Sequence, residues 1–99
     1  MVQAGTYSAV RHYLKAMQAA GTADGKAVAE KIRELPVDDF FAKGRVRDDG
    51  RLIHDMYLVE VKKPNESKGA WDYYKVLRGI PAEEAAQPLN ESKCSLVKK

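Results

Sequence analysis

The spacing of the apolar residues changes at Pro36, and this change constrains the fold more than any other feature of the sequence. Before Pro36, apolar residues recur at intervals of three and four, as along one side of an α-helix; beyond it, from Arg45 to Val61, the pattern is that of extended segments. A proline disfavours helical geometry in the residue before it, so helical structure must end at Leu35. The chain is therefore expected to fold as two helices followed by extended segments.

The first helix is predicted over residues 6–20. Thr6 is expected to be its N-cap, because the threonine hydroxyl can accept a hydrogen bond from a free amide of the first turn. Gly21 follows the helix and can adopt the positive φ with which many helices end. The apolar face of this helix consists of Tyr7, Val10, Leu14 and Met17.

A second helix is predicted from Asp24 to Leu35, with Val28, Ile32 and Leu35 on one face. Only residues 21–23 separate the two helices. Because a connection this short keeps consecutive helices antiparallel, the two should form a helical hairpin.

A β-hairpin is predicted next. Residues 45–47 and 51–61 read as strands, and Asp48-Asp49-Gly50 between them is a turn signal because glycine accepts the positive φ that such turns require. In the second strand, apolar residues point to both sides near positions 56–59. This pattern predicts a strand whose middle is covered on both faces.

The C-terminal third is predicted to contain one more extended segment, at residues 71–77, and one short helix, at residues 80–86. Pro88 ends that helix, residues 63–69 form a loop and residues 89–99 form a coil on the surface. As an isolated fragment the chain is thus expected to be α+β: a helical hairpin, a β-hairpin and a short C-terminal helix.

Length and charge exclude several classes of protein. The chain of 99 residues is one domain or part of one. No apolar run approaches the roughly 20 residues of a membrane-spanning helix, and residues 1–5 lack the basic and apolar stretches of a secretory signal. The 17 Lys and Arg and the 14 Asp and Glu are mixed along most of the chain, which gives a net charge of +3 without a concentrated basic face.

The titratable residues do not form a catalytic or metal-binding pattern. His12 and His54 are far apart, and neither has a Cys or His at ligand spacing. Cys94 is the only cysteine and has no base beside it that could activate its thiol. We therefore expect no catalytic residue, no metal, no cofactor and no enzyme activity. The aromatic pair Phe40-Phe41 is interpreted as a packing anchor, and the group Trp71, Tyr73 and Tyr74 as a core or interface cluster.

The order of several short segments resembles one family, the extracellular substrate-binding proteins of ABC transporters of the branched-chain amino acid type, in their C-terminal part. The resemblance covers nearly the whole chain. The matching segments are Tyr7-Ser8-Ala9-Val10, Tyr13-Leu14-Lys15-Ala16, Ala20-Gly21-Thr22, Asp39-Phe40-Phe41, Gly44-Arg45-Val46-Arg47-Asp48-Asp49-Gly50-Arg51, Asp55-Met56-Tyr57-Leu58, Val61-Lys62-Lys63-Pro64, Trp71-Asp72-Tyr73-Tyr74-Lys75 and Ile80-Pro81.

The resemblance implies an α/β fold of two lobes with the ligand between them, of which residues 1–99 form a single partial domain. By analogy, residues 6–35 are the helical pair of lobe 1, residues 36–44 the hinge crossover, and residues 45–99 the lobe 2 hairpin and C-terminal tail. Phe41, Lys43 and Gly44 would then belong to the hinge. Tyr7, near the start of a helix beside the cleft, is the one position that the resemblance suggests as a ligand contact.

The resemblance also implies partners for the full-length parent: an amino acid or small organic acid as ligand, and an ABC permease. The parent would be periplasmic, whereas this chain, without a signal peptide, would be cytoplasmic if translated alone. We expect the fragment not to bind a ligand usefully by itself and to form a homodimer or higher oligomer, because apolar faces shaped for missing neighbours favour association.

The leading interpretation is thus a substrate-binding component of an ABC importer, present as a C-terminal fragment, with no nucleic-acid partner and no membrane insertion. An alternative remains open: a small basic oligomeric α+β domain for protein interaction or nucleic-acid binding. Its support is the isoelectric point near 9.0, the basic chain end and the aromatic cluster.

Overall fold

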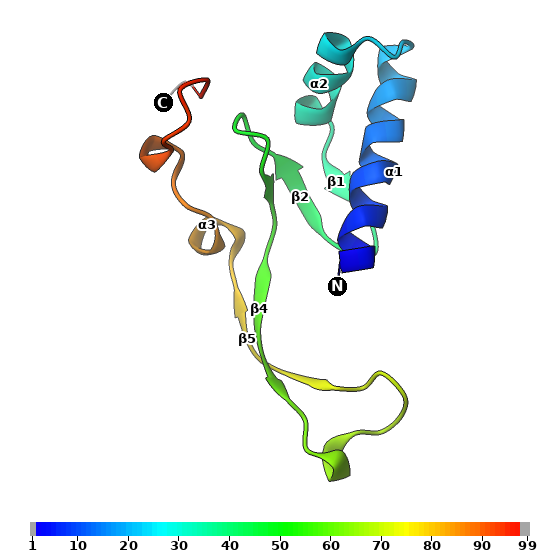
Figure 1. The fold of residues 1–99 in the computed structure, drawn as a ribbon, viewed down its shortest axis with the longest axis vertical. Helices are drawn as coiled ribbons and strands as arrows, with labels where there is room; N and C mark the ends of the chain where they lie inside the picture. The colour runs from blue at the N-terminus through cyan, green and yellow to red at the C-terminus, as the bar shows by residue number, and fades with distance from the viewer. Residues whose placement is uncertain (1, 98–99) are drawn as a thin grey trace.

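A computed structural model describes residues 2–97 of the chain. A helical pair comes first, then two small antiparallel sheets, and last a C-terminal segment that returns alongside them (Figure 1). The elements are α1 (Val2–Ala20), α2 (Gly25–Glu34), β1 (Val37–Asp38), β2 (Lys43–Val46), β3 (Leu52–Ile53), β4 (Met56–Val61), the 3-10 turn η1 (Pro64–Glu66), β5 (Tyr74–Ile80), α3 (Ala82–Ala85) and the 3-10 turn η2 (Leu89–Glu91).

Helix α1 begins four residues before the predicted start. The Thr6 hydroxyl donates to the carbonyl oxygen of Val2 at 3.0 Å, one turn earlier in the same helix, so the prediction of Thr6 as the N-cap was wrong. The other end is as predicted: Gly21 has a φ of 68°, and its amide donates to Met17 O at 3.0 Å.

Helix α2 begins and ends one residue inside the predicted bounds, with Asp24 and Leu35 as its caps. The Asp24 carboxylate accepts a hydrogen bond from the Ala27 amide at 3.2 Å and caps the N-terminus. Leu35, before Pro36, is extended with ψ 132° and ends the helix. The two helices pack together as the predicted antiparallel hairpin.

Strands β1, β2 and β3 form one antiparallel sheet in that order. The predicted turn between β2 and β3 is confirmed: Gly50 has a φ of 82°, and Arg47 N donates to Arg51 O at 2.9 Å across it. The predicted strand 51–61 is not continuous, however. It breaks at residues 54–55, and β4 beyond the break belongs to the other sheet.

Strands β4 and β5 form a two-stranded antiparallel ribbon, called the β4–β5 ribbon below. Every residue of β4 is exposed, so nothing in the described chain covers this strand, contrary to the prediction of coverage on both faces. The predicted extended segment 71–77 becomes regular only at Tyr74, because residues 62–73 form an excursion. Within the excursion, Trp71 has a φ of 70° and Lys62 Nζ lies 2.7 Å from Asp72 Oδ1.

The predicted short helix is α3, which ends at Ala85, and the predicted coil contains the turn η2. Residues 98–99 of that coil lie outside the described residues. None of the helices within residues 2–97 is long and apolar enough to cross a membrane.

The small core lies between the two helices and the β1–β3 sheet. Its buried apolar residues are Ala16, Val28, Val37 and Ile53. Helix α1 faces this core with residues spaced four apart, Ser8, His12 and Ala16, all buried. The apolar stripe predicted for α1 therefore points elsewhere, and Tyr7, Val10 and Leu14 are each about half exposed.

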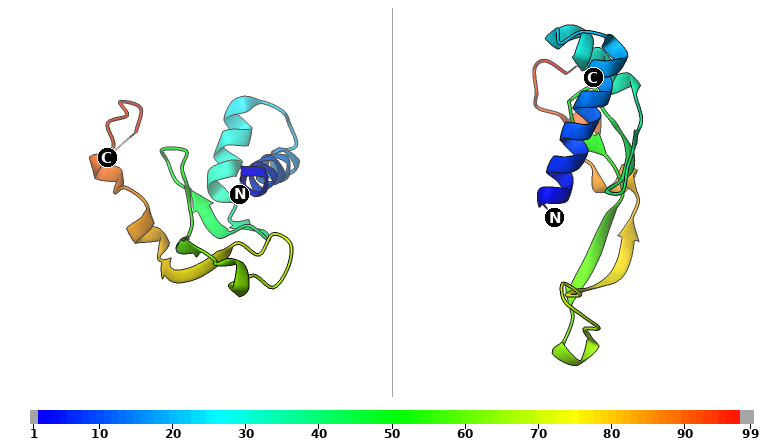
Figure 2. Two further views of the ribbon diagram at one scale, coloured as in Figure 1. Left: turned by 60° about the horizontal axis from the view of Figure 1, so that its bottom comes forward. Right: turned by 90° about the vertical axis from the view of Figure 1, so that its right-hand side faces the viewer.

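The chain exposes more surface than a closed domain of its mass. Its radius of gyration is 16.8 Å, against about 13 Å for a compact domain of about 100 residues. Its accessible surface is 7907 Å², where a folded monomer of 11.0 kDa exposes about 5600 Å². Figure 2 shows one cause: the β4–β5 ribbon extends away from the helices. The chain thus exposes about 2300 Å² more than a closed monomer of its mass.

Candidate functional site

Tyr7, the predicted ligand contact, lies beside Phe40 on the outer surface. Their ring centroids are 5.1 Å apart with planes inclined at 58°. Tyr7 is 52% exposed and Phe40 is 71% exposed. The prediction of Phe40-Phe41 as a packing anchor is right only for Phe41, whose ring packs on His54 at 5.3 Å. An exposed aromatic pair of this kind is a ready contact for an apolar or aromatic group.

Asp39 holds the turn that presents Phe40. The Ser8 hydroxyl, buried on α1, donates to Asp39 Oδ2 at 2.6 Å. The amides of Phe41 and Ala42 donate to Oδ1 at 2.9 and 3.0 Å. The Ser8 hydrogen bond holds the pKa of Asp39 below its ordinary value, against partial desolvation, and the two amides act in the same direction. The turn is thus fixed to α1 by an ionised carboxylate.

A groove runs along α1 from Tyr7. It has a volume of about 480 Å³ and combines an apolar stripe with cationic side chains. The cationic side chains in its lining are Arg11 and Lys15, both of which also border Asp38 and Asp39 on their other side. This chemistry suits a group that is apolar and negatively charged. The residues lining the groove are Thr6, Tyr7, Val10, Arg11, Leu14, Lys15 and Gln18.

The predicted hinge residues lie next to one another at the start of β2. Phe41 precedes the strand, and Lys43 and Gly44 are its first two residues. Gly44 has a packing role here, because a Cβ at this position would overlap the carbonyl oxygen of Ile53 on the neighbouring strand. Movement of these residues between two lobes stays a prediction.

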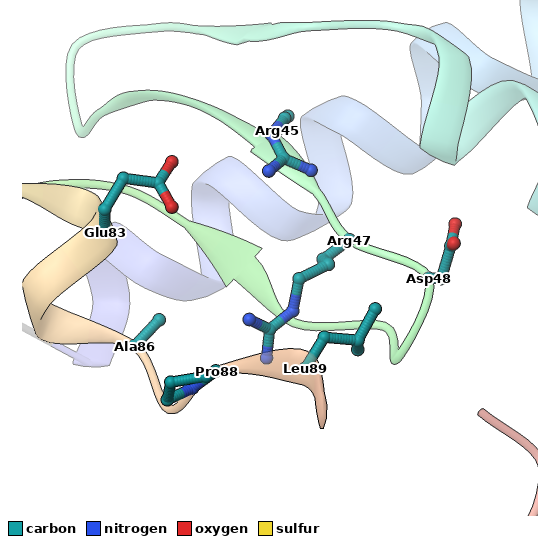
Figure 3. A pocket seen from close by; sticks show the side chains of 7 residues that line it. All are labelled: Arg45, Arg47, Asp48, Glu83, Ala86, Pro88 and Leu89. Atoms are coloured by element: carbon teal, nitrogen blue, oxygen red, sulfur yellow. The ribbon is translucent and has the colours of Figure 1, made fainter. Parts of the chain in front are cut away.

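A second cavity, of about 430 Å³, separates β2 and its turn from the C-terminal segment (Figure 3). Arg47 joins its two walls: Nε and Nη2 donate to the two Asp49 carboxylate oxygens at 3.0 and 2.6 Å, and Nη1 donates to Gln87 O at 2.8 Å. The guanidinium lowers the pKa of Asp49 to about 2. The residues lining this cavity are Arg45, Arg47, Asp48, Glu83, Ala86, Pro88 and Leu89.

Sequence reasoning missed this tie between the turn and the C-terminal segment. The only signal in the sequence was Arg47 two residues before Asp49 in a turn. This spacing indicates the local ion pair, but not the hydrogen bond from Arg47 to the carbonyl oxygen of Gln87, 40 residues away. The side chain of Arg45, on β2, makes no hydrogen bond to another side chain or carbonyl within residues 2–97, and Figure 3 shows it on the wall facing the α3 segment.

The titratable residues that could support catalysis are occupied structurally or isolated. His12 is buried and donates from Nε2 to the carbonyl oxygen of Ile32 at 2.8 Å, which joins α1 to α2. His54 Nδ1 donates to the neighbouring Asp55 O at 2.7 Å, and Cys94 is exposed. Among residues 2–97, no group of three His, Cys, Asp or Glu side chains is placed to hold a metal ion.

Comparison with known proteins gives one consistent family. The family model described as "Periplasmic binding protein" matches residues 1–70. A periplasmic binding protein of Burkholderia mallei is 54% identical to this chain; the match covers 93% of this chain and 24% of that protein, with a TM-score of 0.89. A branched-chain amino acid ABC transporter periplasmic ligand-binding protein of Burkholderia xenovorans LB400 is 46% identical, over 97% of this chain and 26% of that protein, also with a TM-score of 0.89.

No curated protein sequence matches the chain significantly. The chain spans about a quarter of the length of the two solved structures that it matches. Its mixture of helices and small antiparallel sheets superposes on both structures over nearly all of its residues, and both are binding proteins. The family match covers well over half of the sequence. The chain therefore belongs to the periplasmic binding protein family.

Proposed function

We propose that this chain is the part of an ABC importer's substrate-binding component that contributes one wall of the site for an amino acid or related small organic acid. The single observation that carries this proposal is the 46% identity, over 97% of the chain, with a protein described as the ligand-binding protein of a branched-chain amino acid ABC transporter. The assembled receptor would then lie in the periplasm, and its partner would be the ABC permease.

The groove along α1 supports this role. Tyr7 and Phe40 offer an apolar surface, while Arg11 and Lys15 supply positive charge beside it. An amino acid or organic acid has a carboxylate that such cations attract, and its apolar part can lie on the aromatic rings. The groove is open to solvent, whereas small-molecule sites bury most of their ligand. The opposite wall must come from other polypeptide, so the 99 residues alone are expected to bind weakly or not at all.

The two-lobe arrangement belongs to the same proposal. Residues 6–35 are assigned to one lobe and the hairpin and tail of residues 45–99 to the other, with Phe41, Lys43 and Gly44 in the crossover between them. The large exposed surface supports the idea that each part packs against further polypeptide in the receptor.

A chimera tests the proposal. The matched quarter of the Burkholderia xenovorans protein is replaced by this chain, and thermal unfolding is followed with and without leucine, isoleucine or valine. A ligand present at 100 times its dissociation constant stabilises the folded state by about 2.7 kcal/mol, which is readily seen as a rise in Tm. The unmodified Burkholderia protein and the isolated 99-residue chain are measured beside it.

The expected result is a ligand-dependent rise in Tm for the chimera and for the unmodified protein, and none for the isolated chain. In the chimera, Tyr7→Ala should reduce the rise, and Tyr13→Ala, a tyrosine on the same helix outside the groove lining, is the matched control. A folded chimera that no longer responds to a ligand stabilising the unmodified protein would contradict the proposal.

A further inference from the structure

Phe40 is the more exposed member of the aromatic pair in the proposed ligand wall. Its side chain is 71% exposed and lies against Tyr7, with 5.1 Å between the two ring centroids. Phe40 belongs to the turn between β1 and β2, which passes beside the first turns of α1 (Figure 1). The position of its ring therefore depends on what fixes this turn.

The side chain of Asp39 fixes the backbone on both sides of Phe40. The amides of Phe41 and Ala42 donate to Asp39 Oδ1 at 2.9 and 3.0 Å. The Asp39 amide in its turn donates to Ala42 O at 3.2 Å and closes the turn. An aspartate that accepts hydrogen bonds from the amides just after it stabilises a turn in one conformation. Phe40 is thus held between residues that share one carboxylate.

Ser8 attaches this turn to the helix that contains Tyr7. It is 1% exposed, and its hydroxyl donates to Asp39 Oδ2 at 2.6 Å. Tyr7 and Ser8 are consecutive residues of α1, so this hydrogen bond locates the turn relative to the Tyr7 ring. The Ser8 hydroxyl, the two amides and the charge of Arg11 hold the pKa of Asp39 below its ordinary value, against partial desolvation. The carboxylate is therefore ionised at neutral pH and accepts all three hydrogen bonds.

We infer that Ser8 and Asp39 are positioning residues for ligand binding, because together they hold the Phe40 ring against Tyr7. Neither residue is among those lining the groove, so both act through the turn. A ring that is already held in place loses less conformational freedom when a ligand packs on it. Ordering one free side chain on binding weakens affinity about twofold to tenfold. This inference deepens the proposed function and rests on it for the role of the wall.

Fluorine NMR of the 99-residue chain tests the positioning without any ligand. The chain has two phenylalanines, so labelling with 4-fluorophenylalanine gives two signals, and Phe40→Leu assigns them. Tyr7→Ala removes the ring beside Phe40 and gives the change in chemical shift that accompanies loss of the contact. Ser8→Ala should move the Phe40 signal in the same direction by a comparable amount. Ser67→Ala is the matched control, since it removes a serine hydroxyl bonded to Gly69 O in the excursion, and it should leave the signal in place.

Leucine binding to the chimera, measured by titration calorimetry at a temperature where every variant is folded, tests the consequence. Ser8→Ala should raise the dissociation constant about twofold to tenfold, and Ser67→Ala should not change it. In a chimera that already contains Phe40→Ala, Ser8→Ala should have little further effect, because its effect on binding passes through the missing ring. A merely structural role for Ser8 would give the same factor with and without Phe40.

An unchanged Phe40 signal in Ser8→Ala would overturn the inference, and so would an equal effect of Ser8→Ala on leucine affinity in the two backgrounds. Far-UV circular dichroism identifies any variant that has lost its fold. A chimera that does not bind leucine, beside an unmodified protein that does, overturns the proposed function instead. The fluorine spectra of the isolated chain still decide whether Ser8 positions Phe40, so the two proposals fail separately.

Discussion

Removing the Ser8 hydroxyl should destabilise the fold, because this group attaches the Phe40 turn to α1. Ser8 is buried, and its hydroxyl donates to Asp39 Oδ2 at 2.6 Å. A hydrogen bond to a charged group contributes about 1.5 to 3 kcal/mol. Asp39 is only half-buried and keeps two amide donors, so water can compensate in part. We expect Ser8→Ala to lower the free energy of unfolding by about 1 to 1.5 kcal/mol.

Urea unfolding followed by far-UV circular dichroism measures this loss at one protein concentration. Thr6→Ala is the matched control, because the Thr6 hydroxyl is exposed and bonds only within its own helix; its effect should stay within about 0.5 kcal/mol.

The pH dependence gives an independent reading. The folded pKa of Asp39 lies below its ordinary value of 3.8, so its stabilisation is present above that pH and is lost as the pH falls through the folded pKa. Ser8→Ala removes the largest cause of the shift and should flatten the acid limb. A variant as stable as the wild type, with an unchanged acid limb, would refute this account of the turn.

The other predictions concern the β2–β3 hairpin. Gly44→Ala should destabilise the chain in the same urea assay, since the new Cβ would overlap the Ile53 carbonyl oxygen. Gly5→Ala is the control: a Cβ at position 5 contacts no atom within 4 Å, so this change should stabilise α1 by about 0.5 to 1 kcal/mol. A Gly44→Ala variant as stable as the wild type would contradict the close packing of β2 on β3. Arg47→Ala removes the hydrogen bond to Gln87 O, so it should release the C-terminal segment and speed limited proteolysis near residue 87. Arg45→Ala is the control and should not change the cleavage rate. Equal cleavage rates in the two variants would show that the contact between Arg47 and Gln87 does not hold the segment.

Local signals explain what the sequence predicted well. Helix α2 and its end before Pro36 depend on residues within one or two turns of each other. The same holds for the turn that ends in Gly50, where a positive φ is required. The family resemblance, confirmed by the comparisons, depends on ordered short segments and so needs no three-dimensional contact to be recognised.

Non-local packing explains what the sequence did not predict. The apolar stripe of α1 indicated its inner face, yet the core is built on the stripe of Ser8, His12 and Ala16, where small and hydrogen-bonded side chains allow close approach to α2. The pairing of β4 with β5 spans the excursion of residues 62–73, and no local pattern sets its register.

The candidate site divides in the same way. Tyr7 came from the resemblance, whereas its partner Phe40 depends on a turn fixed by the contact between Ser8 and Asp39, which are 31 residues apart. Arg47 depends on a carbonyl still farther along the chain.

The leucine response of the chimera tests the central claim most directly. If these 99 residues form one wall of a receptor's ligand site, the chimera should show a leucine-dependent rise in Tm close to that of the unmodified Burkholderia xenovorans protein. A chimera with the circular dichroism spectrum of the unmodified protein but no leucine-dependent change in Tm, while that protein responds, would contradict the claim.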